Sequence, residues 1–520
     1  SCPFNVCHQD WQIQGPVAEP HHPRRLASRR VGSNTPACVL KNSRLQALRG
    51  RPVPAWWLDA KLGIIVHWTP ASVPGFAPVD VDIGELVKAG ERDAFANSPY
   101  AEWYENSLRF PDSPTSRHHR EVWANRPYEE FAADWEAGLE QWDPDRWAAQ
   151  FAASGARYVV LVTKHMDGYC LWPTNVRNPR RPGWHSRRDV VGELREAVLA
   201  AGMRFGVYYS GGLDSTFNDR RIGSIGESVD AIPRGDYPAY AEAQVRELIA
   251  RYQPSVVWND VAWPATGNEL WPLFEHYYES VPDGVVNDRW LPWSPFVATT
   301  RAPFVRRTID GALGKQARRD GGLIPPRPPH SDYRTPEYVS FADIQRKPWE
   351  CVRGMDQSFG YNAASRPEHF IARDELLSML TDIVAKGGNL LLNVGPRGVD
   401  AQIPEEQSAR LAWLGEWFRP NADAIVATRP WVTPGTTSRE GRSVRYTARD
   451  DVVYACVHSG DEKVTLPDVA ATPSTAVTAV DGTPLSWSDS AAGISVDLLP
   501  GAPESSPSVI ALARVGARPA

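Results

Sequence analysis

The chain has 520 residues, of which 42% are hydrophobic and 23% are charged, and this composition is typical of a globular protein. The length exceeds what one ordinary core supports, so we expect two domains, or a large barrel with an accessory unit. A formal net charge of −6 argues against a nucleic-acid partner. The sequence contains no run of 18 apolar residues, so we expect no membrane span. The 21 Trp residues favour a carbohydrate ligand, because indole faces stack well on sugar rings.

Residues 1–50 are rich in Arg, His and Pro and have little periodicity, which predicts a poorly ordered leader. They contain no apolar signal region, so we expect a cytoplasmic rather than a secreted protein.

From residue 51 onward, short apolar runs alternate with amphipathic stretches of helical length. The predicted strands are Leu62–Trp68, Arg157–His165, Arg204–Ser210, Ser255–Asp260, Gly284–Asp288 and Asn389–Gly395. The predicted helices are Asp145–Ala153, Val190–Ala201, Tyr237–Tyr252, Asn268–Val281, Arg373–Lys386 and Glu405–Arg419. This alternation indicates the α/β class, with a parallel sheet and helical crossovers. Over residues 51–428 it predicts a (β/α)8-like TIM-type barrel as the catalytic domain.

Two further regions depart from this alternation. An Arg- and Pro-rich stretch near residues 290–330 shows no clear element, and we interpret it as an insertion or loop in the barrel. Residues 429–520 alternate apolar with polar positions between Gly, Pro and Asp turns, a pattern that predicts a C-terminal antiparallel β-sandwich.

Nearly every predicted strand ends in polar or aromatic side chains, and in a barrel these ends carry the active site. The side chains in question are His67, His165, Tyr208, Trp258, Asp260 and Arg289. Together they supply the hydrogen-bond donors, acceptors and aromatic faces that a sugar ring requires. No GxGxxG or GxxxxGK[ST] motif is present, so a nucleotide site has no support.

A retaining glycosidase needs an ionised nucleophile and a separate proton donor, usually both carboxyl groups. Asp260 suits the nucleophile, because it follows a buried strand and has no Lys or Arg within three positions. The proton donor stays open at this point among Glu102, Glu337 and Glu350, since sequence spacing alone does not choose between them.

Several motifs resemble the glycoside hydrolase family 29 α-L-fucosidases, in that family's order and over roughly residues 55–430. They include "LGIIVHWTPASVPGFAP", "YAEWYENSLRFPDSPT", "VVLVTKHMDGYCLWPT", "RFGVYYSGGLD", "VVWNDVAWP", "SDYRTPEY" and "KGGNLLLNVGPRG". The resemblance implies a barrel with a C-terminal β-sandwich, and an exo-acting retaining hydrolysis of terminal α-L-fucose through a covalent fucosyl-enzyme. It implies no metal and no organic cofactor.

Residue by residue, the resemblance makes Asp260 the nucleophile and Glu337 the acid/base of the family's broad-specificity branch. The positions that it implies around the fucose are His67, Glu102, Trp103, His165, Tyr208, Trp258, Arg289 and Phe359.

The sequence departs from the family pattern at Met166, where a second histidine is usual, and in the long stretch before Glu337. Two alternatives therefore stay open: a hydrolase for another L-sugar or a fucan, and a catalytically silent fucose-binding protein. The expected partner is a fucosylated oligosaccharide or glycoconjugate, with no nucleic acid and no membrane, and a homo-oligomer is left open.

Overall fold

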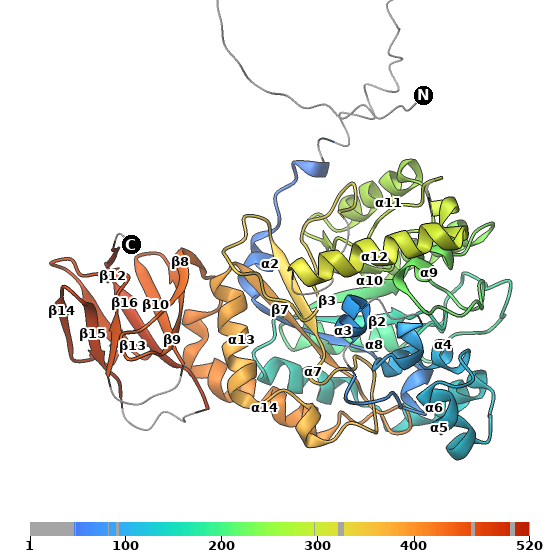
Figure 1. The fold of residues 1–520 in the computed structure, drawn as a ribbon, viewed down its shortest axis with the longest axis horizontal. Coiled ribbons are helices and arrows are strands. Elements are labelled where there is room, and N and C mark those ends of the chain that lie inside the picture. Colours follow the sequence, from blue (N-terminus) through green and yellow to red (C-terminus); the bar gives the residue numbers. More distant parts are fainter. Residues whose placement is uncertain are drawn as a thin grey trace, which may run out of the picture. The chain divides into compact units, whose positions relative to one another are not determined.

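The computed structural model describes residues 46, 48–81, 83–89, 93–295, 297–320, 327–458, 463–499 and 505–518. The predicted leader at residues 1–50 lies almost wholly outside this part of the chain. A parallel sheet and its helices come first along the described chain, and antiparallel strands follow (Figure 1). Within the described residues, no helix combines the length and the apolar character needed to cross a membrane.

Seven parallel strands form the central sheet, in the spatial order β5-β4-β3-β2-β1-β7-β6. Their bounds are β1 (Leu62–Val66), β2 (Tyr158–Lys164), β3 (Arg204–Ser210), β4 (Val256–Asp260), β5 (Val285–Val286), β6 (Trp349–Arg353) and β7 (Gly388–Val394). Strands β1, β2 and β7 are buried along their whole length, as expected for apolar runs covered on both faces. The predicted α/β barrel architecture is therefore confirmed, with β6 as a strand that the sequence does not predict.

The gap between the edge strands β5 and β6 is bridged by residues 332–338, which we call the closing segment. On one side, the backbone N–H of Asp332 donates to the carbonyl of Val286 over 3.0 Å. On the other side, the N–H of Glu350 in β6 donates to the carbonyl of Arg334 over 2.8 Å. The closing segment thus completes the barrel wall without being a regular strand.

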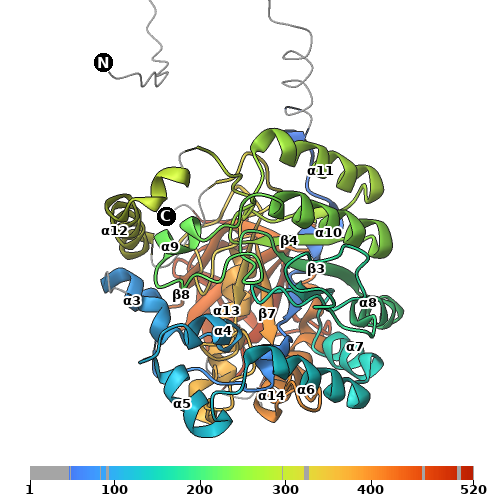
Figure 2. The same cartoon turned by 90° about the vertical axis from the view of Figure 1, so that its right-hand side faces the viewer.

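Helices surround this sheet, and Figure 2 shows α7, α8, α10 and α11 along its outer side. The helices that the sequence predicts are present as α7 (Pro144–Ala153), α8 (Val190–Ala200), α10 (Tyr237–Tyr252), α11 (Gly267–Ser280), α13 (Arg373–Ala385) and α14 (Glu405–Asn421). The other helices are α2 (Ala55–Ala60), α3 (Ile83–Ala89), α4 (Tyr104–Leu108), α5 (Pro114–Trp123), α6 (Phe131–Gly138), α9 (Ile225–Asp230) and α12 (Pro303–Asp320). Their starts follow ordinary capping chemistry: the Asp189 carboxylate, for example, accepts from the N–H of Gly192 over 3.0 Å at the start of α8.

Helix α12 corrects the prediction that residues 290–330 contain no regular element. Pro303 occupies the first helical position, where its fixed φ is compatible with a helix and its missing N–H costs nothing. The following residues include Ala, Leu, Lys, Gln and Arg, which favour helices. Their high Arg content hides the short apolar face, and that is why the pattern resembles a solvated loop. In Figure 1, α12 lies beside α9 and α3.

The C-terminal strands form two main antiparallel sheets, in the orders β13-β16-β10-β9-β8 and β11-β15-β14, plus the β12-β17 pair. Their bounds are β8 (Arg429–Thr437), β9 (Ser443–Arg449), β10 (Val452–Val457), β11 (Lys463–Leu466), β12 (Val469–Ala470), β13 (Ala476–Ala479), β14 (Trp487–Ser490), β15 (Gly493–Asp497), β16 (Ser508–Ala513) and β17 (Gly516–Ala517). The apolar faces of these sheets share one core, with Val444, Val464 and Ile494 fully buried. Arg445 of β9 pairs with Asp382 of α13 at 2.5 Å, so the sheets contact the barrel's outer helices rather than its pocket.

Candidate active site

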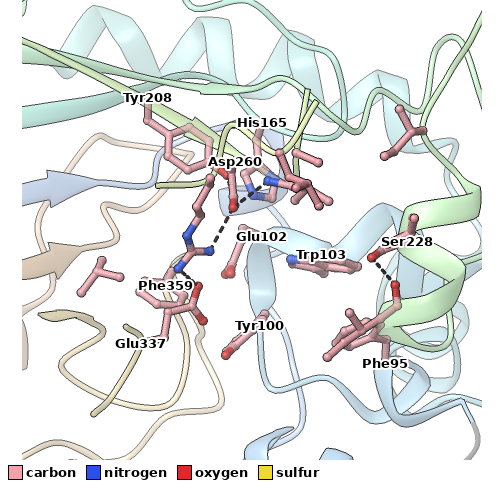
Figure 3. A pocket seen from close by; sticks show the side chains of 18 of the residues that line it. Phe95, Tyr100, Glu102, Trp103, His165, Tyr208, Ser228, Asp260, Glu337 and Phe359 are labelled. Carbon is pink, nitrogen blue, oxygen red and sulfur yellow. Dashed lines mark hydrogen bonds and ion pairs between the residues drawn. The ribbon is translucent and has the colours of Figure 1, made fainter. Parts of the chain in front are cut away.

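The carboxyl ends of the parallel strands meet at one cavity of about 450 Å³. All ten predicted site residues line it: His67, Glu102, Trp103, His165, Tyr208, Trp258, Asp260, Arg289, Glu337 and Phe359. Figure 3 shows labelled members of this set, which come from different strands and loops and converge on one space. Side chains that lie up to 292 positions apart in the chain are thus brought together at one edge of the sheet, as expected for a barrel.

Asp260 ends β4, and its carboxylate has a donor on each oxygen. Tyr208 donates its hydroxyl to Oδ2 over 2.7 Å, while Arg289 Nη1 lies 3.0 Å from Oδ1. The N–H of Val261 also donates to Oδ1, over 2.8 Å. Burial alone would raise the pKa of Asp260, but Arg289, Tyr208 and Val261 outweigh it and hold that pKa below its ordinary value. Asp260 is therefore an ionised carboxylate at neutral pH.

The backbone after Asp260 turns sharply. Val261 and Ala262 have φ values of 56° and 69°, a left-handed conformation that is uncommon for a β-branched residue such as Val. Gly212 makes this turn sterically allowed, since a Cβ there would lie 1.5 Å from the carbonyl oxygen of Val261. Strained backbone of this kind persists only where the surroundings hold it, and it is concentrated at functional sites.

Arg289 links Asp260 to Glu337. Its Nη2 lies 2.6 Å from Oε1 of Glu337, and its Nη1 contacts Asp260. Thr335 fixes the guanidinium further, accepting from Nε at its hydroxyl and from Nη2 at its carbonyl, both at 3.2 Å. The guanidinium also lies over the Trp258 ring, 4.7 Å from its centroid. One rigid cation therefore positions both carboxylates.

Glu337 is held by the closing segment. The N–H of Tyr338 donates to the carbonyl of Val352, and the N–H of Val352 donates to the carbonyl of Pro336, each over 3.1 Å. Tyr338 has a φ of 54°, so the residue after Glu337, like the one after Asp260, adopts a left-handed conformation.

His67 and His165 contribute neutral imidazoles. Burial lowers the pKa of His67 to about 4 and that of His165 to about 3. Asn393 donates its amide to the carbonyl of Phe359, so its Oδ1 accepts from Nδ1–H of His67, 2.6 Å away. This arrangement fixes the tautomer of His67 and leaves its Nε2 as an acceptor.

Glu102 also lines the cavity, but its pKa is shifted upward, whereas that of Asp260 is shifted downward. Burial raises the pKa of Glu102 to about 7, against the hydrogen bond that its Oε2 accepts from Gly360 over 2.7 Å. Its neighbour Trp103 packs its ring against Phe95, with centroids 4.9 Å apart. Phe359 lies 5.3 Å from the His67 ring between centroids and adds an apolar patch.

Glu350, the third candidate proton donor, does not line the cavity. It belongs to β6, is fully buried inside the barrel, and accepts from the hydroxyl of Tyr158 over 2.5 Å and from the indole of Trp258 over 3.2 Å. The choice of donor therefore narrows to Glu102 and Glu337.

Met166 stands where the family pattern usually has a second histidine. It is 5% exposed and belongs to an apolar cluster with Phe95, Leu213 and Ile222. Its thioether is not among the cavity-lining groups. An unbranched apolar side chain fills a core gap there, in keeping with the adaptability of methionine.

The sequence does not single out the other half of the cavity, which is apolar. We call it the apolar wall, and it consists of Ile225, Val229, Ile232, Val297, Ile309 and Leu313. The spacing of these residues in the sequence could have indicated two apolar helix faces. They recur at i, i+4 and i+7 from Ile225, and at i and i+4 from Ile309.

A parallel barrel whose strand ends carry paired carboxylates, neutral histidines and aromatic faces is the architecture of a glycoside hydrolase. The α-L-fucosidase family model matches residues 37–423. An α-L-fucosidase of Dictyostelium discoideum is 30% identical over 402 residues, covering 74% of each chain, and one of Branchiostoma floridae is 30% identical over 473 residues, covering 87% of this chain and 90% of its own. The chain belongs to the α-L-fucosidase family.

Solved structures agree with this assignment. The α-fucosidase of Thermotoga maritima in complex with a mechanism-based inhibitor matches with a TM-score of 0.74 and 35% identity, covering 90% of this chain and 98% of its own. The same enzyme in complex with fucose matches with a TM-score of 0.72 over the same shares.

Proposed function

We propose that the protein releases terminal α-L-fucose from glycans or glycoconjugates with retention of anomeric configuration. The observation that supports this most directly is the contact of one guanidinium, that of Arg289, with both Asp260 and Glu337. A single guanidinium bridges two carboxylates only if they lie close together, and retaining enzymes need a separation of about 5–5.5 Å.

In the first step, the ionised carboxylate of Asp260 attacks C1 of the fucose. The bond from C1 to the glycosidic oxygen breaks, and that oxygen takes a proton from Glu337. In the second step, the Glu337 carboxylate removes a proton from water, the water oxygen bonds to C1, and Asp260 departs as a carboxylate. Both groups end in their starting protonation states.

The remaining residues suit recognition of the sugar. His67 offers Nε2 as an acceptor for a hydroxyl group, and Glu102 offers a carboxyl group in the same cavity. Fucose has a methyl group in place of a hydroxymethyl group, and the ring of Phe359 supplies an apolar surface for it. Arg289 holds Asp260 ionised before substrate arrives, so no reorganisation is needed when charge develops at C1.

The first test is release of nitrophenol from 4-nitrophenyl α-L-fucoside by the wild type and by Asp260→Ala. We expect turnover in the wild type and none in the variant, with α-L-fucose as the first anomer seen by proton NMR. Asp283→Ala, which removes a half-exposed carboxylate outside the cavity, should retain full activity. Release of the β-anomer would contradict retention, and fucose binding without turnover in the wild type would indicate a silent binding protein.

The second test decides between Glu337 and Glu102 as the acid/base. With a good leaving group such as nitrophenol, Glu337→Ala should still form the fucosyl-enzyme but hydrolyse it slowly. Added azide should then attack C1, displace Asp260 and yield α-L-fucosyl azide, because azide needs no general base. Glu102→Ala should give no azide adduct, and the reverse pattern would transfer the role to Glu102.

A further inference from the structure

The apolar wall forms a part of the cavity that carries no charged side chain. Figure 3 shows Asp260 and Glu337 at one side and Ser228 of α9 at the other, with Trp103 between them. Every charged residue that lines the cavity belongs to the first side: Glu102, Asp260, Asp288, Arg289 and Glu337. The far side is the apolar wall, supplied by α9 and the turn after it, the 3-10 helix Val297–Arg301, and α12.

Three polar contacts join α9 and its N-cap residue to α12 and make this wall a fixed structure. The Asp310 carboxylate on α12 accepts from the N–H of Gly226 over 2.7 Å and from the hydroxyl of Ser224 over 2.9 Å. At the other end of α9, Asp230 pairs with Arg306 of α12 at 3.3 Å. Ile309 and Leu313, one turn apart on α12, are thereby held against the cavity.

Two hydroxyl groups line the cavity beside the apolar wall, and each already donates its hydrogen to a backbone carbonyl. The lining hydroxyl of Ser228 donates to the carbonyl of Ile225 over 2.7 Å, and that of Thr300 donates to the carbonyl of Val297 over 2.5 Å. A sugar placed here would exchange its hydration for apolar side chains, and burying a hydroxyl group without a hydrogen-bond partner is unfavourable. An apolar group would meet no such penalty.

We propose that the apolar wall binds the leaving group, and that the preferred substrates are α-L-fucosides of hydrophobic alcohols or phenols rather than of a second sugar. This inference rests on the proposed fucosidase function, because the leaving group enters the wall only when fucose occupies the charged end. It assigns the aglycone class of the site, and it makes Leu313 and Ile309 specificity-determining residues.

Ethyl, butyl and hexyl α-L-fucosides provide the test, because their leaving groups have nearly equal basicity and differ mainly in apolar length. Each buried methylene should multiply kcat/KM about fourfold, so we expect at least a tenfold rise from ethyl to hexyl. A flat series would overturn the proposal, as would faster cleavage of fucosyl-α-(1→2)-galactose than of the hexyl compound.

Calorimetric binding of the same series to Asp260→Ala separates this inference from the proposed function. A tenfold tighter dissociation constant for hexyl than for ethyl fucoside would support the apolar wall whether or not the wild type turns the compounds over. Equal affinities would overturn the aglycone assignment even if the wild type hydrolyses every fucoside. No hydrolysis of any fucoside by the wild type would overturn the proposed function alone.

Two variants of one helix give a matched control. Leu313→Gln should lower the hexyl-to-ethyl ratio of kcat/KM about tenfold, because it places an amide on the wall. Phe304→Gln makes a comparable apolar-to-polar change at a side chain that is 71% exposed and outside the cavity, so the ratio should stay at its wild-type value. Equal ratios in all three proteins would contradict the role of α12.

Discussion

The Nη2 atom of Arg289 lies 2.6 Å from Oε1 of Glu337, and the same guanidinium holds Asp260 through Nη1. The cation is almost enclosed, since its side chain is 13% exposed. Coulombic attraction is weakly screened at such a site, so the charge of Arg289 acts strongly on the Asp260 carboxylate.

Replacing Arg289 by Met should lower kcat/KM about 10²–10³-fold, the usual cost of removing one preorganised electrostatic contact. Arg289 is the largest influence that lowers the pKa of Asp260, so the variant should also need a higher pH to ionise its nucleophile. The acid limb of the pH profile of kcat/KM, measured with an aryl fucoside, should therefore move to higher pH. Arg289→Lys keeps the charge but loses the planar fork, and it should shift that limb less. An unmoved acid limb in Arg289→Met would show that another group governs it.

Gly212→Ala should displace the turn that follows Asp260, because the new Cβ would meet the carbonyl oxygen of Val261 at 1.5 Å. A shift of about 1 Å in a catalytic group costs roughly 10²-fold in rate, so we expect at least that loss in kcat. Gly311→Ala is the matched control, since its added Cβ would meet nothing within 4 Å. That variant should keep its activity and gain about 1 kcal/mol in unfolding free energy from better helix propensity. Equal activities would show that the turn does not position Asp260.

Glu350→Gln should change how stability depends on pH. Burial raises the pKa of Glu350 from 4.5 to about 7, against the hydrogen bonds from Tyr158 and Trp258. A carboxyl group whose folded pKa is raised contributes stability that is present below its unfolded pKa and is lost as pH rises through its folded pKa. Between pH 4.5 and 7 the wild type should therefore lose up to about 3 kcal/mol relative to the variant.

Urea unfolding of both proteins at several pH values measures this difference. Other carboxyl groups titrate in both proteins and cancel in the comparison. Unfolding free energies that run parallel from pH 4.5 to 8 would show that Glu350 is ionised throughout.

Lys164→Met should destabilise the fold, because it leaves Asp214 buried without its cation. The two side chains are fully buried and pair at 2.7 Å, and Lys164 Nζ also lies 4.4 Å from the centroid of the Tyr209 ring. Removing one partner of such a pair costs about 3–5 kcal/mol of unfolding free energy, measurable by urea denaturation. The double variant Lys164→Met/Asp214→Asn should recover part of that loss.

A partly exposed pair provides the comparison, since the side chains of Arg246 and Glu242 are 34% and 28% exposed. Arg246→Met removes the cation that contacts Glu242 at 2.8 Å on the outer side of α10, and we expect a loss below about 1 kcal/mol. Similar losses in the Lys164 and Arg246 variants would contradict the importance of burial.

Much of the barrel is predictable from the sequence, because its central strands are continuous apolar runs that only a doubly covered parallel sheet explains. The predicted and observed bounds of β3 are identical, those of β2 differ by one residue at each end, and those of β4 differ by one residue at the start. The site follows from the same logic, since parallel strands end at one edge. His67, Tyr208 and Asp260 therefore reach one cavity although each follows or ends a different strand.

What the sequence does not reveal depends on contacts between distant residues. The segment "WECVR" resembles a polar loop because it contains Glu350. The Glu350 carboxyl group can be buried in a strand because it accepts a hydrogen bond from Tyr158, which lies 192 positions away in the sequence. The motif shows only that Met166 replaces a usual histidine, whereas the fold shows that it packs with Phe95 and Ile222. In α12, frequent Arg residues obscure an apolar face that becomes meaningful only when α9 lies beside it.

The two carboxylates rest on different kinds of backbone. Asp260 ends a strand that is paired on both sides, whereas Glu337 lies in the closing segment, which joins β5 to β6 without being a regular strand. The chain from β5 to that segment carries α12, so under the proposed mechanism a change in its length would alter the side that receives the departing group and leave β4 untouched. Changes in this part of the chain, whether by evolution or by engineering, should therefore alter the aglycone preference without moving Asp260.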